Sequence, residues 1–298
     1  MSDEPDTYLT RLAARTARTG TVLCLGLDPD PAALPDGFTA DVRGIESFAR
    51  LLLDAALPYA AAVKPNLAFF EAFGSAGIAA LERLRALVPS DVPVVIDAKR
   101  ADIGSTAARQ ATALFDGLGA DAITVSPYLG EEAIAPLLAR SDRFAYVLCR
   151  TSNPGAAELQ GLEVESDDDK APAEPLYARV ARRAATWGPG GTVGLVVGAT
   201  APDELSAIRA IAPRLAFLVP GVGAQGGDEA AVLRDGPARD GPSAARPGGG
   251  LLVNVSRGIA NAALAGDDLA GNGPAKTDPG ERIAAATRDW ARRLRVLP

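Results

Sequence analysis

The stretch Val94–Thr106 reads VVIDAKRADIGST, an apolar, β-branched run that ends in alternating charges and leads into a helical segment. Continuous apolar runs of this kind are typical of strands buried on both faces of a parallel sheet, with helices as the crossovers. Asp97 and Lys99 lie two residues apart, so on a strand both side chains project from the same face. The stretch therefore predicts one βα unit with charged groups at the carboxyl end of its strand.

The same pattern recurs along the chain. Eight apolar runs predict strands: Thr21–Asp28, Ala61–Asn66, Val92–Lys99, Ala122–Pro127, Ala145–Thr151, Val193–Thr200, Ala216–Gly223 and Leu251–Ser256. Seven intervening or following segments have apolar residues three to four apart and predict helices: Phe48–Leu57, Gly77–Leu87, Thr106–Gly117, Glu131–Leu138, Leu176–Thr186, Pro202–Ile211 and Ile283–Leu294. The first run starts at residue 21 and the eighth at residue 251, a mean repeat of about 33 residues, which suits a βα unit. Eight such units predict an α/β fold, a single-domain (β/α)8 TIM barrel over residues 1–298.

A doubly wound open sheet is the alternative, because alternation of strands and helices does not by itself separate a closed sheet from an open one. Polar groups at the ends of the runs favour the barrel. In barrel enzymes the carboxyl ends of all strands surround one central site. Nearly every run here ends in a group able to take part in chemistry: Asp28, Lys64, Asp97, Lys99, Ser152, Thr200, Gln225 and Arg257.

The composition excludes several classes of enzyme and partner. The 298 residues contain no histidine, which rules out Ser-His-Asp hydrolysis, Cys-His proteolysis and HExxH zinc sites. The two cysteines, Cys24 and Cys149, allow neither a disulfide framework nor a four-cysteine zinc site. A formal charge of −7 without a basic stripe argues against nucleic acid. No run of 18 apolar residues and no signal-peptide pattern occurs, so a soluble, cytoplasmic protein with no membrane partner is expected.

Charged residues around Asp97 indicate a catalytic site. Burying an isolated charge is very unfavourable, and an ion pair is seldom the best way to stabilise a core, so Asp97 beside Lys99 favours chemistry over a structural salt bridge at the rim. Asp102 follows just after the strand and adds a second carboxylate near the lysine. Lysine is scarce, with four residues against 26 arginines. Lys64, at the end of another strand, therefore completes a predicted network of alternating charges.

The last two strands predict a phosphate site. Pro220–Asp228 (PGVGAQGGD) follows the seventh run as a glycine-rich turn with free N–H groups, and Arg257 follows the eighth run. Loops after strands seven and eight commonly bind phosphate in barrels, where backbone amides and a guanidinium match the dianion. The GxGxxG pattern at Gly221–Gly226 is a weak signal, because it does not follow the first strand and has no acidic partner of the dinucleotide-binding type.

Two segments fall outside the repeat. Gly161–Pro175 is acidic and contains proline, and Arg234–Gly250 is rich in glycine, proline and arginine. Both compositions predict mobile surface loops. Solvated insertions, without a specific role for their charges, are the simplest interpretation of both.

Taken together, the motifs resemble those of the orotidine 5'-phosphate decarboxylase family. The resemblance runs from LGLDPDP at Leu25–Pro31 through DAKRADIGST and PGVGAQGGD to VNVSRGI. The motifs Lys64-Pro65-Asn66 and Phe69-Phe70-Glu71 are similar to those of the longer bacterial (type 2) branch. DxKxxD alone marks only a superfamily of barrels that includes sugar-phosphate aldolases and decarboxylases, whereas its combination with the glycine loop and the arginine is specific. No role for Phe69, Phe70 or Glu71 follows from the sequence.

The resemblance implies conversion of orotidine 5'-monophosphate (OMP) to UMP and CO2 in pyrimidine biosynthesis, by a homodimer without metal or organic cofactor. It implies that Lys99 protonates the pyrimidine carbon that loses CO2, and that Asp97 crowds the substrate carboxylate. Asp102, together with Ile103 and Thr106, is expected to reach into the neighbouring subunit's site. The implied substrate contacts are Asp28 and Lys64 on the ribose hydroxyls, with Lys64 also in the catalytic network, Ser152 on the base, Gln225 and Arg257 on the phosphate, and Asn66 and Pro220 in the same binding set.

Three alternatives remain open. A metal-assisted sugar-phosphate decarboxylase or synthase shares DxKxxD, but those relatives generally use histidine, which this chain lacks. A sugar-phosphate aldolase forms a Schiff base on its lysine, whereas two aspartates flanking Lys99 favour a charged, non-nucleophilic amine. A non-catalytic nucleotide-binding barrel needs Gln225 and Arg257 but has no need for Asp97 beside Lys99.

Overall fold

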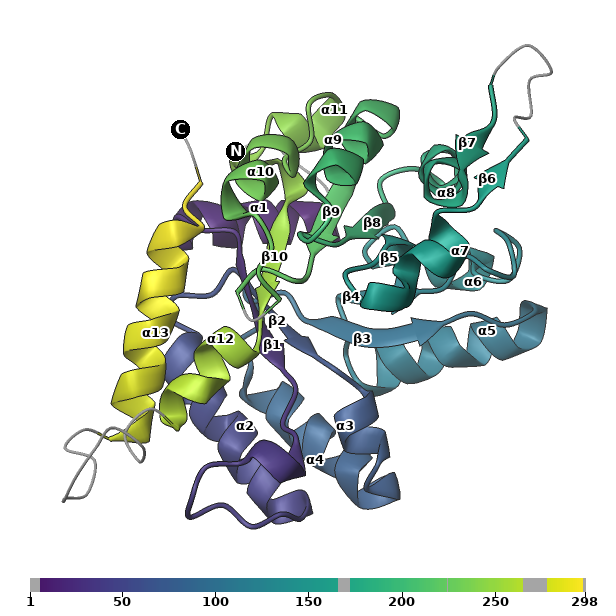
Figure 1. The fold of residues 1–298 in the computed structure, drawn as a ribbon. Helices are drawn as coiled ribbons and strands as arrows, with labels where there is room; N and C mark the ends of the chain where they lie inside the picture. Colours follow the sequence, from purple (N-terminus) through teal and green to yellow (C-terminus); the bar gives the residue numbers. More distant parts are fainter. Residues whose placement is uncertain (1–5, 166–171, 224, 265–277, 297–298) are drawn as a thin grey trace.

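Eight parallel strands form one closed sheet (Figure 1). The structure is a computed structural model that describes residues 6–165, 172–223, 225–264 and 278–296. Neighbouring strands follow the order β2-β1-β10-β9-β8-β5-β4-β3, and parallel bridges from Val63 to Val94 and from Asn66 to Asp97 join the two ends. The predicted single-domain (β/α)8 barrel is therefore confirmed. The strands are β1 Leu23–Leu27, β2 Ala62–Pro65, β3 Val95–Arg100, β4 Ala122–Val125, β5 Phe144–Arg150, β8 Val193–Val197, β9 Ala216–Val219 and β10 Leu252–Val255.

Helices surround the barrel, and most of them connect consecutive strands on its outside (Figure 1). They are α1 Tyr8–Thr19, α2 Val42–Ala56, α3 Ala68–Glu71, α4 Gly74–Leu87, α5 Gly104–Ala111, α6 Ala135–Leu138, α7 Ala157–Gln160, α8 Leu176–Ala184, α9 Pro202–Ile211, α10 Glu229–Asp235, α11 Gly241–Ala244, α12 Arg257–Ala260 and α13 Pro279–Arg293. All seven predicted helical segments contain observed helix, but Glu131–Leu138 is α-helical only at α6. Pro136 favours the first helical turn, because it lacks an N–H, so the helix begins just before it. Among the helices that the structure describes, none has the length and apolar character that a membrane span requires.

Alternate residues of each strand face two different apolar layers, as the strand period of two requires. Val63 and Val253 point outward and pack in the core between sheet and helices, whereas Ala62 and Leu252 point into the barrel. On four strands the next inward position, two residues further on, is polar. Apolar inward residues Ala62, Val95, Ala122 and Leu252 are followed by Lys64, Asp97, Thr124 and Asn254. The carboxyl ends of the strands therefore carry a polar layer above an apolar one.

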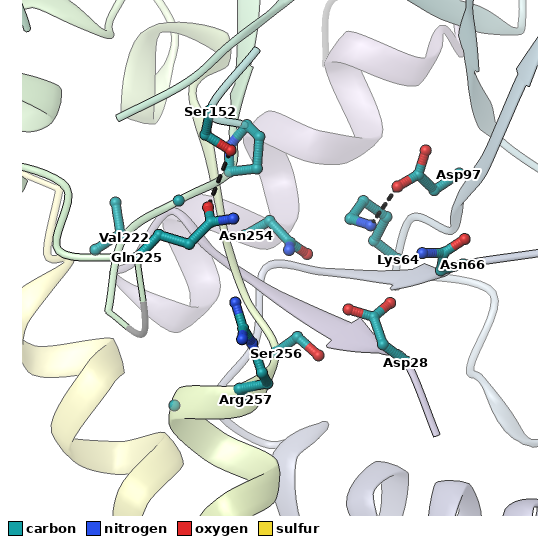
Figure 2. Close-up of a pocket in the computed structure, with 13 residues that line it drawn as sticks. Asp28, Lys64, Asn66, Asp97, Ser152, Val222, Gln225, Asn254, Ser256 and Arg257 are labelled. Carbon is teal, nitrogen blue, oxygen red and sulfur yellow. Dashed lines mark hydrogen bonds and ion pairs between the residues drawn. The ribbon is translucent and has the colours of Figure 1, made fainter. Parts of the chain in front are cut away.

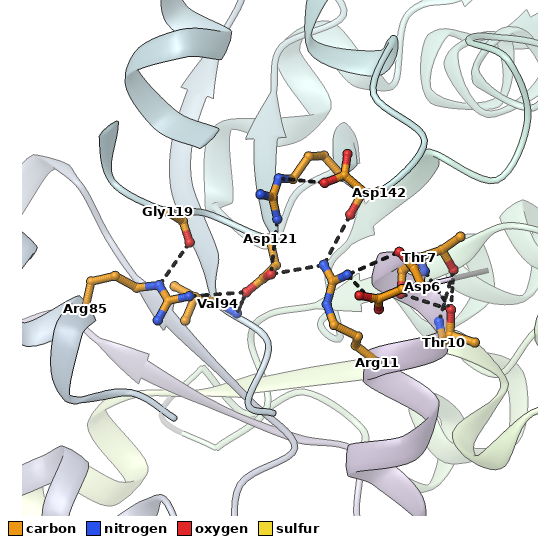
Figure 3. Close-up of polar contacts among 10 residues, drawn as sticks. Asp6, Thr7, Thr10, Arg11, Arg85, Val94, Gly119, Asp121 and Asp142 are labelled. Carbon is orange, nitrogen blue, oxygen red and sulfur yellow. Dashed lines mark hydrogen bonds and ion pairs between the residues drawn. The ribbon is translucent and has the colours of Figure 1, made fainter. Parts of the chain in front are cut away.

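Helix α1 fills the amino-terminal end of the barrel. Its Tyr8 and Leu12 are buried in the inward apolar layer, and the Tyr8 hydroxyl lies 3.0 Å from that of Tyr146. Arg11 donates to the carboxylate of Asp121, just before β4, at 3.0 Å, and Figure 3 shows this contact among the surrounding arginines and aspartates. Apolar packing and a partly buried ion pair thus hold α1 at the end of the barrel remote from the polar layer.

The two segments outside the repeat have different structures. In 161–175, the strands β6 Glu163–Val164 and β7 Glu174–Pro175 form a short antiparallel ribbon, and residues 166–171 lie outside the described ranges. Segment 234–250 contains the end of α10, helix α11 and a 3-10 turn at Pro247–Gly250, with Asp235 and Ser243 buried. The mobility of both segments stays a prediction, but the second is not an irregular loop. Its glycine- and proline-rich composition predicted a loop, whereas tertiary contacts stabilise short helical turns there.

Candidate active site

A cavity lies at the carboxyl ends of the strands, where the inward polar layer meets the loops (Figure 2). Its lining comes from, or directly follows, β1, β2, β3, β5, β9 and β10. The cavity is lined by Asp28, Lys64, Asn66, Asp97, Ser152, Pro220, Gly221, Val222, Gln225, Asn254, Ser256, Arg257 and Gly258. Within the described part of the chain, no group of three or more Asp, Glu or Cys side chains is placed to hold a metal ion.

One carboxylate lies between two lysines on the wall formed by β2 and β3. Asp97 Oδ2 accepts a hydrogen bond from Lys64 Nζ at 2.8 Å, and Asp97 Oδ1 accepts one from Lys99 Nζ at 2.7 Å. Lys64 is 4% exposed, whereas the side chain of Lys99 is 51% exposed. One ammonium is therefore fixed inside the wall, and the other has access to a bound molecule.

The charges on this wall stabilise one another. Burial alone would raise the pKa of Asp97, but the neighbouring charges of Lys64 and Lys99 hold it well below its ordinary value. Burial alone would lower the pKa of Lys64, but the carboxylates of Asp97 and Asp28 hold it above its ordinary value. At neutral pH the wall therefore presents a fixed carboxylate and a fixed ammonium, which act electrostatically on whatever binds beside them.

The opposite wall, from the loops after β5, β9 and β10, carries hydrogen-bonding groups and a cation. The Ser152 hydroxyl donates to Gln225 Oε1 at 2.9 Å (Figure 2). Gly221 has a φ of 98°, and a Cβ there would lie 2.9 Å from Gln225 Oε1, so this turn requires glycine. Arg257 lines the cavity and has no ion-pair partner among the residues that the structure describes. An unpaired guanidinium beside a glycine-rich turn suits a phosphate dianion.

Two buried acceptors of the cavity, Asp28 Oδ1 and Asn254 Oδ1, have no hydrogen-bond partner in the described ranges. Gly26 leaves room for the amide, since a Cβ there would lie 3.1 Å from Asn254 Oδ1. An unpaired buried acceptor costs about 1–3 kcal/mol, so both oxygens are suited to donors on a ligand. The sequence reasoning missed Asn254, which shares the inward face of β10 with Leu252, and Ser256, which directly follows β10.

Comparison with known proteins assigns the family. Residues 21–268 match the model of the family described as "Orotidine 5'-phosphate decarboxylase / HUMPS family". The chain belongs to the orotidine 5'-phosphate decarboxylase family. The resemblance that the sequence motifs carry is thereby confirmed.

Individual relatives of this decarboxylase match it over nearly the whole chain. The orotidine 5'-phosphate decarboxylase of Roseiflexus castenholzii is 46% identical over 279 residues, which cover 93% of this chain and 92% of the relative. The solved OMP decarboxylase of Leishmania donovani has a TM-score of 0.77 and 38% identity, with 97% of each chain covered. The solved UMP synthase of Leishmania donovani has a TM-score of 0.79 and 39% identity, but this chain covers only 56% of that longer chain.

Four of the predicted site residues do not line the cavity of their own chain: Lys99, which contacts the lining residue Asp97, and Asp102, Ile103 and Thr106. The Asp102 carboxylate accepts a hydrogen bond from the Ile103 backbone N–H at 2.7 Å, and Ile103 is 65% exposed. In the described structure no ion pair joins Asp102 to Lys99, which the sequence places close together. Thr106 lines a separate groove between α4 and α5. The structure thus separates Asp102, Ile103 and Thr106 from the other predicted site residues.

The branch motif Phe69–Glu71 lies on α3, which follows β2. Phe70 is fully buried in the core, and Glu71 forms an ion pair with Arg100 at the end of β3. This pair links α3 to β3, the strand that carries Asp97 and Lys99. The sequence indicated no role for Glu71, because only the folded structure brings its partner Arg100, 29 residues later in the chain, into contact with it.

Proposed function

We propose that the cavity is the site at which this protein decarboxylates OMP to UMP. As a member of its family, the protein is a carboxy-lyase of pyrimidine synthesis. One observation carries the assignment of the cavity: Asp97 lies between two lysines on one wall, and Arg257 lies without an ion-pair partner in the described ranges on the other. The first arrangement suits a reacting carboxylate and the second suits a phosphate, and OMP carries both groups.

In this proposal Lys99 donates the proton. Loss of CO2 breaks the bond between the ring carbon and the carboxyl carbon and leaves the electron pair on the ring carbon. The Lys99 ammonium stabilises that charge and transfers a proton to it, so a C–H bond replaces the C–C bond and the amine is left neutral. Asp97 holds the ammonium in place and lies beside the departing carboxylate. Direct decarboxylation requires barrier lowering on the order of 20 kcal/mol, and fixed charges in a preorganised site supply it without metal or organic cofactor.

The remaining cavity residues bind the nucleotide. Phosphate binding far from the reacting carbon supplies binding energy that orients the base against the lysine. The proposed contacts are Gln225 and Arg257 on the phosphate, Asp28 and Lys64 on the ribose hydroxyls, Ser152 on the base, and Asn66 and Pro220 in the surrounding lining.

We extend the proposal to a homodimer with shared active sites. Asp102 and Thr106, which lie outside their own cavity, then contribute to the site of a second copy. Large apolar side chains are exposed on the loops after β3 and β4, as is typical of interfaces: Ile103 by 65%, Tyr128 by 83% and Leu129 by 52%. A cytoplasmic location belongs to the same proposal, because the two cysteines are buried and unpaired, which suits a reducing compartment.

Replacing Lys99 tests the proposed role in chemistry. We expect Lys99→Ala to lower kcat for OMP by at least about 10³-fold, measured as loss of the orotate absorbance in the presence of EDTA. The Kd for UMP should change by less than about threefold, because the phosphate and ribose contacts lie elsewhere. Borohydride added during turnover by the wild type should trap no adduct. A covalent adduct on Lys99 would replace the proton-donor role by a Schiff base.

Arg257→Ala is the complementary variant, directed at binding rather than chemistry. We expect kcat/KM for OMP to fall about 100-fold, the loss of a charged hydrogen bond to phosphate. The slow reaction of orotidine, the phosphate-free nucleoside, should change by less than about twofold, because the lost contact is absent there. Equal losses on both substrates would show that Arg257 supports the fold or the base site instead.

A further inference from the structure

The pairing of strands β3 and β4 has a register shift beside the proposed proton donor. They pair at Ile96 with Ile123 and next at Arg100 with Val125, so β3 advances four residues where β4 advances two. Thr124 is the single β4 residue opposite this irregular stretch. Lys99 within it has a φ of 49°, and among the described residues it is the one non-glycine residue with a positive φ. Such a conformation is rare for an L residue and persists only where surrounding contacts hold it.

The Thr124 side chain supplies those contacts. Its Oγ1 accepts hydrogen bonds from the backbone N–H groups of Ala98 and Lys99, each at 3.0 Å. The same hydroxyl donates to Asp97 Oδ1 at 2.8 Å. Thr124 is 2% exposed, so water has little access to replace these bonds. One hydroxyl therefore binds the backbone of the lysine and the carboxylate that holds its ammonium.

The direction of these hydrogen bonds is fixed by the donors present. A threonine hydroxyl has one proton and two lone pairs. Two backbone N–H groups occupy the lone pairs and can only donate, so the hydroxyl proton points at Asp97 Oδ1. That oxygen also accepts from Lys99 Nζ at 2.7 Å. Thr124 thus favours the ionised carboxylate and places it where it meets the lysine.

We propose that Thr124 is a positioning residue that aligns Lys99 and Asp97 for proton transfer. The inference rests on the proposed function, because it concerns the alignment of the proton donor named there. Thr124 does not line the described cavity and acts through the two charged residues. Its removal should therefore affect the chemical step and leave nucleotide binding nearly unchanged. A misplacement of about 1 Å at a reacting group can cost about 100-fold in rate.

Two substitutions of Thr124 distinguish the effect of its hydroxyl from the effect of its side-chain shape. Thr124→Val keeps the shape and removes the hydroxyl, and we expect kcat for OMP to fall about 100-fold. The Kd for UMP, measured by calorimetry, should change by less than about threefold. Thr124→Ser keeps the hydroxyl and should retain at least about one third of the wild-type kcat. This rescue by the conservative variant distinguishes positioning from packing.

Thr21→Val is the matched control. Thr21 is also buried. Its hydroxyl accepts a hydrogen bond from the Leu23 backbone N–H at 3.1 Å and donates one to the Leu294 carbonyl at 2.8 Å. It lies at the opposite end of the barrel, just before β1. We expect both Thr21→Val and Thr124→Val to lower the melting temperature, whereas Thr21→Val should change kcat by less than about twofold.

Several outcomes overturn the role of Thr124: a wild-type kcat in Thr124→Val, a loss of UMP affinity as large as the loss of kcat, or a Thr124→Ser variant as slow as Thr124→Val. If Thr124→Val does not fold, Thr124→Cys replaces it with the same expected result, since a thiol is a weak donor and acceptor. Lys99→Ala separates the two proposals. Activity retained in Lys99→Ala refutes the proposed function, whereas an inactive Lys99→Ala with a fully active Thr124→Val refutes only the positioning role.

Discussion

Three side chains donate hydrogen bonds to the carboxylate of Asp97. Lys64 binds one oxygen, and Lys99 and Thr124 bind the other. Protonation of this carboxyl would remove the charge that the buried Lys64 ammonium needs, because a buried ammonium without a partner is strongly destabilising. The residue that orders the site therefore also links the charge of the site to the stability of the fold.

This linkage predicts how stability depends on pH. The pKa of Asp97 is lower in the folded protein than in the unfolded chain, where it is about 3.9. Its contribution to the free energy of unfolding is therefore complete above that value and is lost as pH falls toward the folded-state pKa. We expect wild type to exceed Asp97→Asn by about 2 kcal/mol at pH 7, and this difference to shrink by about 1 kcal/mol between pH 5 and pH 3. Urea unfolding of both proteins measures it; a difference constant down to pH 3 would contradict the linkage.

Among the secondary-structure elements, a buried arginine joins α9 to the segment after α10. The Arg209 side chain is 0% exposed and stacks on the Phe217 ring, 3.5 Å from its centroid. A buried cation needs hydrogen-bond acceptors, and the guanidinium donates to the backbone carbonyls of Ala212, Leu215, Asp235 and Gly236. These bonds anchor the start of segment 234–250, which the sequence alone presents as a loop.

Removing this guanidinium should destabilise the barrel. Arg209→Met preserves most of the side-chain volume but leaves the carbonyls without their donor, and we expect the free energy of unfolding to fall by about 3–4 kcal/mol. Arg214→Met is the nearby control, since the Arg214 side chain is 66% exposed and its Nε lies 4.0 Å from Asp240 Oδ2. This substitution should change the free energy of unfolding by no more than about 0.5 kcal/mol. Thermal and urea unfolding measure both. Similar small losses in the two variants would show that Arg209 is not an anchor.

Across the molecule as a whole, the apolar packing inside the barrel and the polar cavity lie at opposite ends. Helix α1 and the apolar inward layer fill the amino-terminal end, and the polar layer surrounds the cavity at the other. Asp102 follows β3 just after the strand ends and does not line the cavity. In a two-fold dimer each chain can contribute the same residue to the other's site, so the proposed shared site would unite Asp102 with Lys99 of the second copy.

Mixing two inactive variants tests the shared site. Lys99→Ala and Asp102→Asn homodimers should each be nearly inactive, one without its proton donor and the other without its second carboxylate. In a mixed dimer one site carries both defects and the other carries neither. With free exchange about half of the dimers are mixed, so the activity recovered should approach about a quarter of the wild-type site count. Co-expression with two tags isolates the mixed dimers for assay. Confirmed mixed dimers without activity would place Asp102 in its own chain's site.

Local patterns were sufficient to predict most elements and much of the site. Each of the eight apolar runs contains an observed strand or misses one end of it by a single residue, because buried strands are recognisable from a few neighbouring residues. The spacing of Asp97 and Lys99 predicted their contact, although the register shift of β3 and the positive φ of Lys99 replace the regular strand on which that prediction was based. The turns in 234–250 were not recognised, because glycine and proline are typical of loops. The arginine that anchors these turns, Arg209, lies 26 residues before Asp235, whose backbone carbonyl accepts one of its hydrogen bonds.

The βα repeat, the inward alternation of the strands and the family motif could all be predicted from the order of residues, because each depends on residues close together in the chain. Which strand ends meet depends on the folded barrel. Closure between β2 and β3 places Lys64 against Asp97, and the offset between β3 and β4 places Thr124 opposite Lys99. Ladder register and barrel closure join residues that are tens of positions apart, so no local spacing encodes these contacts.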